Sequence, residues 1–85
     1  MHVDPLVFLS NPLKAQVRQL YTQSNFIVSI RYYGYKINLY LLDGYYFEIF
    51  YNHKEDKIEK IQLLDFEHSR MKFYYDQITL PPLAS

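Results

Sequence analysis

The sequence predicts an α+β fold of two layers, in which a four-stranded antiparallel meander is flanked by an N-terminal and a C-terminal helix (α-β-β-β-β-α). Three observations lead to this prediction. Apolar and polar residues alternate through the middle of the chain, as in half-buried strands. Short polar turns separate the alternating segments, and apolar residues with helical spacing occur on each side of them. A chain of 85 residues is expected to form a single domain, 1–85.

The first part of the chain is predicted to be an arm followed by a helix. Residues 1–11 form the arm, because a helix opened by Asp4-Pro5 would be stopped early by Pro12. Asn11 can cap a helix whose first residue is Pro12. The apolar residues that follow recur at i, i+4, i+7 and i+8, which is one helix face: Leu13, Val17, Leu20 and Tyr21. A helix is therefore expected over 12–23.

Three regions supply the four strands: 26–33, the hairpin 36–52 and 57–64. In the first strand one row should face the core, and it contains Phe26, Val28, Ile30 and Tyr32. The segment 57–64 also fits a helix, but the short polar connection before it favours a hairpin.

The register of the central hairpin depends on its turn at Asp43-Gly44. A two-residue loop pairs Leu42 with Tyr45. The aliphatic row of the first strand then lies opposite the row of the second strand that we do not expect in the core. A three-residue loop that includes Leu42 matches the two rows. We therefore expect the three-residue loop and one core row, which contains Ile37, Leu39, Leu41, Tyr45, Phe47 and Ile49.

Residues 65–78 are predicted to form the second helix, with Met71, Tyr74 and Tyr75 on its apolar face. A fifth strand at 70–75 is the alternative, because apolar and polar residues also alternate there. Pro81-Pro82 prevents any continuation, so 79–85 is expected to be an extended tail.

The composition argues against several classes of function. The formal net charge is zero and neither half of the chain is strongly skewed, which disfavours nucleic acid as a partner. There is no cysteine, and the three histidines lack the spacing of metal ligands, so no metal or cofactor is expected. His68 beside Ser69 does not by itself make a catalytic set. An enzyme is therefore not expected, and no catalytic residue is assigned.

Aromatic residues are the unusual feature, at 19% of the chain. If the helices cover one face of the sheet, the other face is unusually aromatic for a solvent surface. We expect this face to be an interface, most simply in a homodimer, although a different protein partner would also fit. A platform for single-stranded RNA and an inert wet surface are the alternatives. The expected interface contains Arg31, Tyr33, Tyr40, Tyr46, Glu48 and Phe50. Within it, Glu48 is expected to have an exposed cross-strand partner such as Arg31.

No apolar run is long enough to span a membrane, and the N-terminus lacks the pattern of a signal peptide. Together with the absence of cysteine, this favours a cytoplasmic protein.

The segment LYLLDGYYFEIFYN, residues 39–52, resembles the central hairpin of small prokaryotic proteins that include the TumE-like toxin components of toxin–antitoxin pairs. The shared features are an aliphatic strand, an Asp-Gly turn and an aromatic strand that carries a glutamate. The C-terminal part of that family has an Asp-Asn-Pro-His-like cluster, whereas this chain has Tyr75-Asp76-Gln77 and no histidine after it. The resemblance therefore implies a small bacterial or phage-type partner protein, and it carries over no active-site residue.

Overall fold

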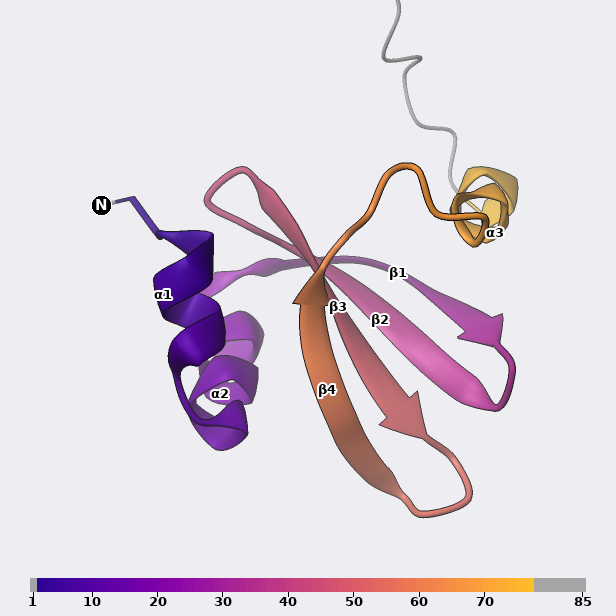
Figure 1. Cartoon of the computed structure of the whole chain (residues 1–85), viewed down its shortest axis with the longest axis horizontal. Helices are drawn as coiled ribbons and strands as arrows, with labels where there is room; N and C mark the ends of the chain where they lie inside the picture. The colour runs from indigo at the N-terminus through magenta and orange to yellow at the C-terminus, as the bar shows by residue number, and fades with distance from the viewer. Residues whose placement is uncertain (1, 78–85) are drawn as a thin grey trace, which may run out of the picture.

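A computed structural model describes residues 2–77 of the chain. Two helices precede a four-stranded sheet and one helix follows it (Figure 1). In chain order the elements are α1 (Pro5–Ser10), α2 (Leu13–Gln23), β1 (Asn25–Tyr32), β2 (Tyr35–Leu42), β3 (Tyr45–Asn52), β4 (Lys57–Leu63) and α3 (Met71–Gln77). The predicted α+β class, the four-stranded antiparallel meander and the helices at its two ends are confirmed.

The sheet has the strand order β1-β2-β3-β4, so β1 and β4 are its edges. Two-residue turns close the first two hairpins. The φ angles are 46° and 83° at Tyr33-Gly34, and 49° and 82° at Asp43-Gly44. Two successive positive φ angles define the type I′ turn, whose twist matches that of the strands it joins.

The three-residue loop that we expected at Asp43-Gly44 is wrong. Leu42 pairs with Tyr45, and Tyr40 pairs with Phe47. The expected single core row is therefore split between the two faces of the sheet. The prediction assumed that only one face is buried. Because helices cover both faces, an apolar row is accommodated on either side, and matching of the rows no longer selects the register.

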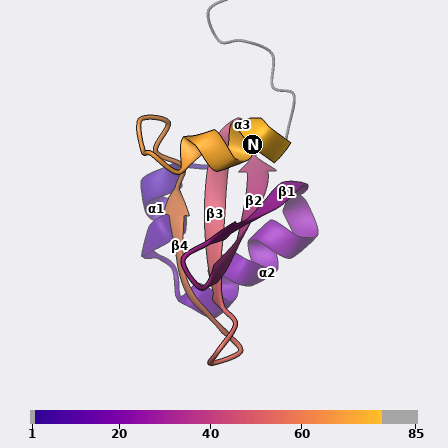
Figure 2. The same cartoon turned by 90° about the vertical axis from the view of Figure 1, so that its right-hand side faces the viewer.

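The helices lie on opposite faces of the sheet (Figures 1 and 2). Phe47 and Ile49 of β3 pack with Phe8 of α1 and Leu20 of α2. Phe50, on the other face of the same strand, packs with residues of α3. Neighbouring residues of a strand point to opposite faces, so two cores form, one on each side. The expectation that the helices share one face is corrected: the sheet is the middle of three layers.

The predicted N-terminal arm contains a helix. In α1 the side chain of Asp4 accepts hydrogen bonds from the backbone N–H groups of Leu6 and Val7, and Pro5 follows at the first position. This is the favoured chemistry of a helix start. Pro12 does stop α1, but only after a helix of six residues that includes the buried Phe8.

The C-terminal segment is a helix rather than a fifth strand. Turns occupy much of 65–70, and α3 begins at Met71. Met71 and Tyr74 are buried against the sheet, while Tyr75 is exposed. The predicted tail 79–85 lies outside the described residues.

Candidate functional site

Glu48, Arg70 and Tyr74 form a buried cluster of hydrogen-bonded polar side chains. Arg70 donates two hydrogen bonds to the Glu48 carboxylate, from Nε to Oε2 at 2.8 Å and from Nη2 to Oε1 at 2.6 Å. The Tyr74 hydroxyl donates to Oε2 at 2.7 Å. Glu48 and Tyr74 are 0% exposed and Arg70 is 4% exposed. The carboxylate is therefore paired bidentately and closed off from solvent.

Each side chain reaches the cluster because of where its element lies. Glu48 is on the central strand β3, on the face that α3 covers. Arg70 immediately precedes α3, and Tyr74 follows one turn later, so both point to the same side of the helix. The Arg70 guanidinium also lies 5.4 Å from the centre of the Phe50 ring, within the range of a cation–π contact.

The electrostatics of the cluster follow from this pairing. The hydrogen bonds to Glu48 raise the pKa of Arg70, against the opposing effect of burial. Burial is the main cause that raises the pKa of Tyr74, and the charge of Glu48 adds to it. Arg70 thus stays charged and Tyr74 stays protonated over the physiological range. Within residues 2–77 the three side chains are closed to solvent and therefore to a substrate, and their hydrogen bonds fix α3 on the sheet.

Sequence reasoning singled out Glu48 but assigned it the wrong partner. We expected an exposed cross-strand contact with Arg31, whereas the ion pair forms with Arg70. Arg31 is exposed and lies on the edge strand β1, two strands away from β3. A glutamate among aromatic residues on a central strand needs a cation within reach. The i, i+4 spacing of Arg70 and Tyr74 was the signal that could have identified these partners.

The expected interface residues do not share one exposed face. Glu48 and Phe50 are buried beneath α3. Tyr46 packs with that same core, but Tyr40 packs with the core on the other side of the sheet. Arg31 and Tyr33 are exposed near the end of β1, and Tyr33 is 85% exposed. The aromatic sheet face that we predicted is therefore mostly covered by the fold.

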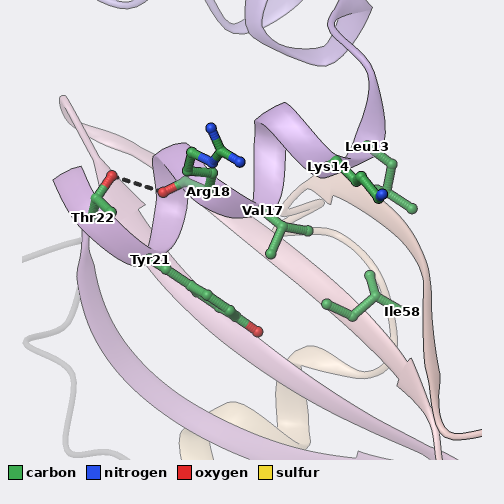
Figure 3. A pocket seen from close by; sticks show the side chains of 7 residues that line it. All are labelled: Leu13, Lys14, Val17, Arg18, Tyr21, Thr22 and Ile58. Carbon is green, nitrogen blue, oxygen red and sulfur yellow. Dashed lines mark hydrogen bonds between the residues drawn. The ribbon is translucent and has the colours of Figure 1, made fainter.

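An open apolar groove lies between α2 and β4 (Figure 3). It has a volume of about 670 Å³. In Figure 3 the side chains of Val17, Tyr21 and Ile58 face the space between helix and strand, while the Arg18 guanidinium lies on the outer side of the helix. The residues that line the groove are Leu13, Lys14, Val17, Arg18, Tyr21, Thr22 and Ile58.

The groove is open because α2 buries a different face from the one that its sequence suggests. Gln16 and Leu20 are the residues of α2 that are fully buried. The Gln16 side chain donates to the backbone carbonyls of Leu9 and Asn11, at 3.1 and 2.7 Å, and so ties α2 to α1. This contact turns the stripe Leu13, Val17, Tyr21 to the margin of the core, where it is half-buried or exposed.

The charged residues of the groove are both cations. Lys14 and Arg18 are exposed, and neither makes an ion pair with any other residue of the described range 2–77. The sequence contains no carboxylate between Asp4 and Asp43, so α2 and the two strands after it carry only positive charge. Positive charge is therefore concentrated in this part of the chain, although the net charge of the whole chain is zero.

Exposed aromatic rings extend the groove at the C-terminal end of α2. Tyr21 and Phe26 are 56% and 55% exposed, and both rings pack on the ring of Tyr40, with centroids 5.8 and 5.5 Å away. Burial raises the pKa of Tyr40. Tyr40, an expected interface residue, therefore lies at the floor of this apolar area rather than on a free sheet face.

A smaller hollow of about 360 Å³ lies on the other face, between β1 and α3. Its lining mixes apolar residues with Arg31 and Asp76, which have opposite charges. Among residues 2–77 no group of three histidine or carboxylate side chains is placed to hold a metal ion. No helix within the same range is long and apolar enough to cross a membrane.

Comparisons of the chain with protein-family models, curated proteins and solved structures give no match. The resemblance of residues 39–52 to TumE-like proteins thus stays a prediction. Inference about function rests on the geometry and charge of this chain.

Proposed function

We propose that this protein is a non-enzymatic interaction module that binds a segment of protein in the groove between α2 and β4. The segment carries an apolar side chain flanked by carboxylates. One observation supports this most directly: the apolar stripe of α2 is open, and its charged neighbours Lys14 and Arg18 have no carboxylate partner in the described range. A partner that buries the stripe and neutralises both cations fits the surface in shape and in charge.

The energetics indicate weak to moderate binding. Burying a Phe or Leu side chain contributes about 1.5–3 kcal/mol. Exposed ion pairs add about 0.2–1 kcal/mol each, because water and salt screen them. A single short segment therefore falls short of the roughly 8 kcal/mol that micromolar affinity requires, unless flanking contacts with Tyr21 and Phe26 contribute. The cations give specificity and faster association more than they give affinity.

A protein segment fits the groove better than single-stranded RNA does. The apolar side chains of the lining are three aliphatic ones, Leu13, Val17 and Ile58, and one aromatic ring, Tyr21, whereas RNA platforms offer several flat aromatic faces on which bases stack. The expected RNA platform also depended on Phe50, which is 4% exposed. Binding of RNA in the groove is therefore one of the outcomes that the test below distinguishes.

A cytoplasmic location stays a prediction.

The test is fluorescence anisotropy with a labelled Gly/Ser peptide that has a central Phe between two Glu residues. We expect binding that weakens with added salt, and that weakens further in the double variant Lys14→Glu, Arg18→Glu. The matched control is Lys36→Glu, Lys54→Glu, which makes the same charge change at two exposed lysines that do not line the groove. Circular dichroism confirms that each variant is folded.

Two outcomes would overturn the proposal. One is that the groove variant and its control bind the peptide equally. The other is that single-stranded oligouridine binds in the groove and displaces the peptide, which would assign the surface to nucleic acid. A variant Val17→Asp, compared with Val7→Asp on the exposed side of α1, tests the apolar contribution separately.

A further inference from the structure

We propose that the segment bound in the groove is Asp65-Phe66-Glu67 of a second copy of this chain. The inference rests on the proposed function and names the partner of that same groove. It replaces the aromatic sheet face as the surface for self-association. The sequence of the segment, an aromatic residue between two carboxylates, matches the chemistry that the groove requires.

The segment Asp65-Phe66-Glu67 projects a large apolar side chain from a fixed turn. Phe66 is 48% exposed, and both of its neighbours are exposed. The Asp65 side chain accepts a hydrogen bond from the backbone N–H of Glu67 at 2.9 Å, and the Asp65 carbonyl accepts from the backbone N–H of His68 at 3.1 Å. These bonds hold the turn before any partner arrives, so little conformational entropy is lost on binding.

A chain cannot place this segment in its own groove. The ring of Phe66 packs against Tyr46, with centroids 6.0 Å apart, and Tyr46 belongs to the core beneath α3. The helix α2, whose residues line the groove, lies on the opposite face of the sheet (Figure 1). The connection from β4 to α3 is short and is fixed at its end by the buried Arg70. Contact between segment and groove must therefore be intermolecular.

The charges of the two surfaces are complementary. The groove presents Lys14 and Arg18, and the segment presents Asp65 and Glu67. Neither pair is used in an ion pair within residues 2–77. The zero net charge of the chain adds little general repulsion between copies. When each copy inserts its segment into the other's groove, the contact occurs twice, and the second contact benefits from the effective concentration that the first creates.

The experiment is analytical ultracentrifugation of the full chain over a range of concentrations and salt. We expect the mass to rise above that of a monomer with concentration, and to fall again in high salt. The groove variant is Lys14→Glu, Arg18→Glu, and the segment variant is Asp65→Lys, Glu67→Lys. Each should be monomeric where the natural chain associates, because like charges then oppose each other. Phe66→Ala should weaken association about tenfold or more.

A charge swap supplies the decisive comparison. Mixing the groove variant with the segment variant should restore association, because an acidic groove then meets a basic segment. The matched controls are Lys36→Glu, Lys54→Glu for the groove and Glu55→Lys, Asp76→Lys for the segment. We expect both controls to associate like the natural chain.

Failure of this inference can be told from failure of the proposed function. If the natural chain is monomeric at every concentration while the acidic peptide still binds in the groove, the second copy is the wrong partner and the proposed function stands. If the chain associates but the mixture of variants remains monomeric, the groove and the segment are not in contact. If neither the peptide nor a second copy binds in the groove, both proposals are overturned.

Discussion

Replacing Arg70 by methionine should strongly destabilise this protein. Arg70→Met removes both hydrogen bonds to Glu48 and leaves a carboxylate that is 0% exposed, with the Tyr74 hydroxyl at 2.7 Å and the more distant Gln62 Nε2 at 3.5 Å as its remaining donors. Removal of one partner of a buried ion pair typically costs about 3–5 kcal/mol. A domain of this length has a total stability of about 4–13 kcal/mol.

The assay is urea unfolding at neutral pH, followed by circular dichroism. With a slope of about 1–3 kcal/mol per molar urea, the midpoint should fall by roughly 1–5 M. The double variant Glu48→Met, Arg70→Met removes both charges and should recover most of that loss, because an apolar pair of similar volume often replaces a buried ion pair without cost. The matched control is Arg31→Met, which should stay within about 0.5 kcal/mol of the natural chain.

A loss of less than about 1 kcal/mol in Arg70→Met would show that the pair contributes no more than an exposed ion pair does. A double variant that is as unstable as Arg70→Met would also contradict the expected role of the ion pair. In that case the cost would come from lost packing of the arginine side chain and not from an uncompensated charge.

Three further predictions concern the same fold. The pKa of Tyr74 is raised above its ordinary value of 10.0, so the native state holds this proton more tightly than the unfolded chain does, and the stability that it contributes is lost above about pH 10. Tyr74→Phe should therefore reduce the alkaline decline of the free energy of unfolding measured in urea, by up to about 1.4 kcal/mol per pH unit, and equal declines would contradict the assignment. Gly44→Ala should cost about 1–2 kcal/mol in the same assay, because φ is 82° there although the space around Gly44 is open; an unchanged midpoint would mean that the turn relaxes. Asp4→Ala should cost about 0.5–2 kcal/mol through loss of the cap of α1, and amide hydrogen exchange should increase in α1 but not in α3.

The elements of the fold were largely predictable because each depends on local chemistry. Alternation fixes the strands, and the Asp43-Gly44 pair fixes the position of the turn. The register was not predictable from the hairpin alone, because it depends on whether one face or both faces are buried. That property is set by α1 and α3, which lie far from the hairpin in the sequence.

The candidate site was harder to predict for a similar reason. The apolar stripe of α2 was recognised, but its spacing favoured burial of Leu13, Val17 and Tyr21 as well as Leu20. The stripe is open because Gln16 is the residue that enters the interior, where it bonds two carbonyls near the end of α1. A glutamine buried by such bonds cannot be identified from helical periodicity, since its partners belong to another element.

The central claim is that the α2–β4 groove and the Asp65-Phe66-Glu67 segment meet between two copies. The most direct test is a dilution series of the isotopically labelled chain, followed by amide chemical shifts in nuclear magnetic resonance spectra. We expect the shifts of Val17 and Tyr21 to change with concentration along one curve, and those of Phe66 and Glu67 to follow the same curve. Shifts that are independent of concentration, or changes confined to the β1 edge and the hollow beside α3, would contradict it.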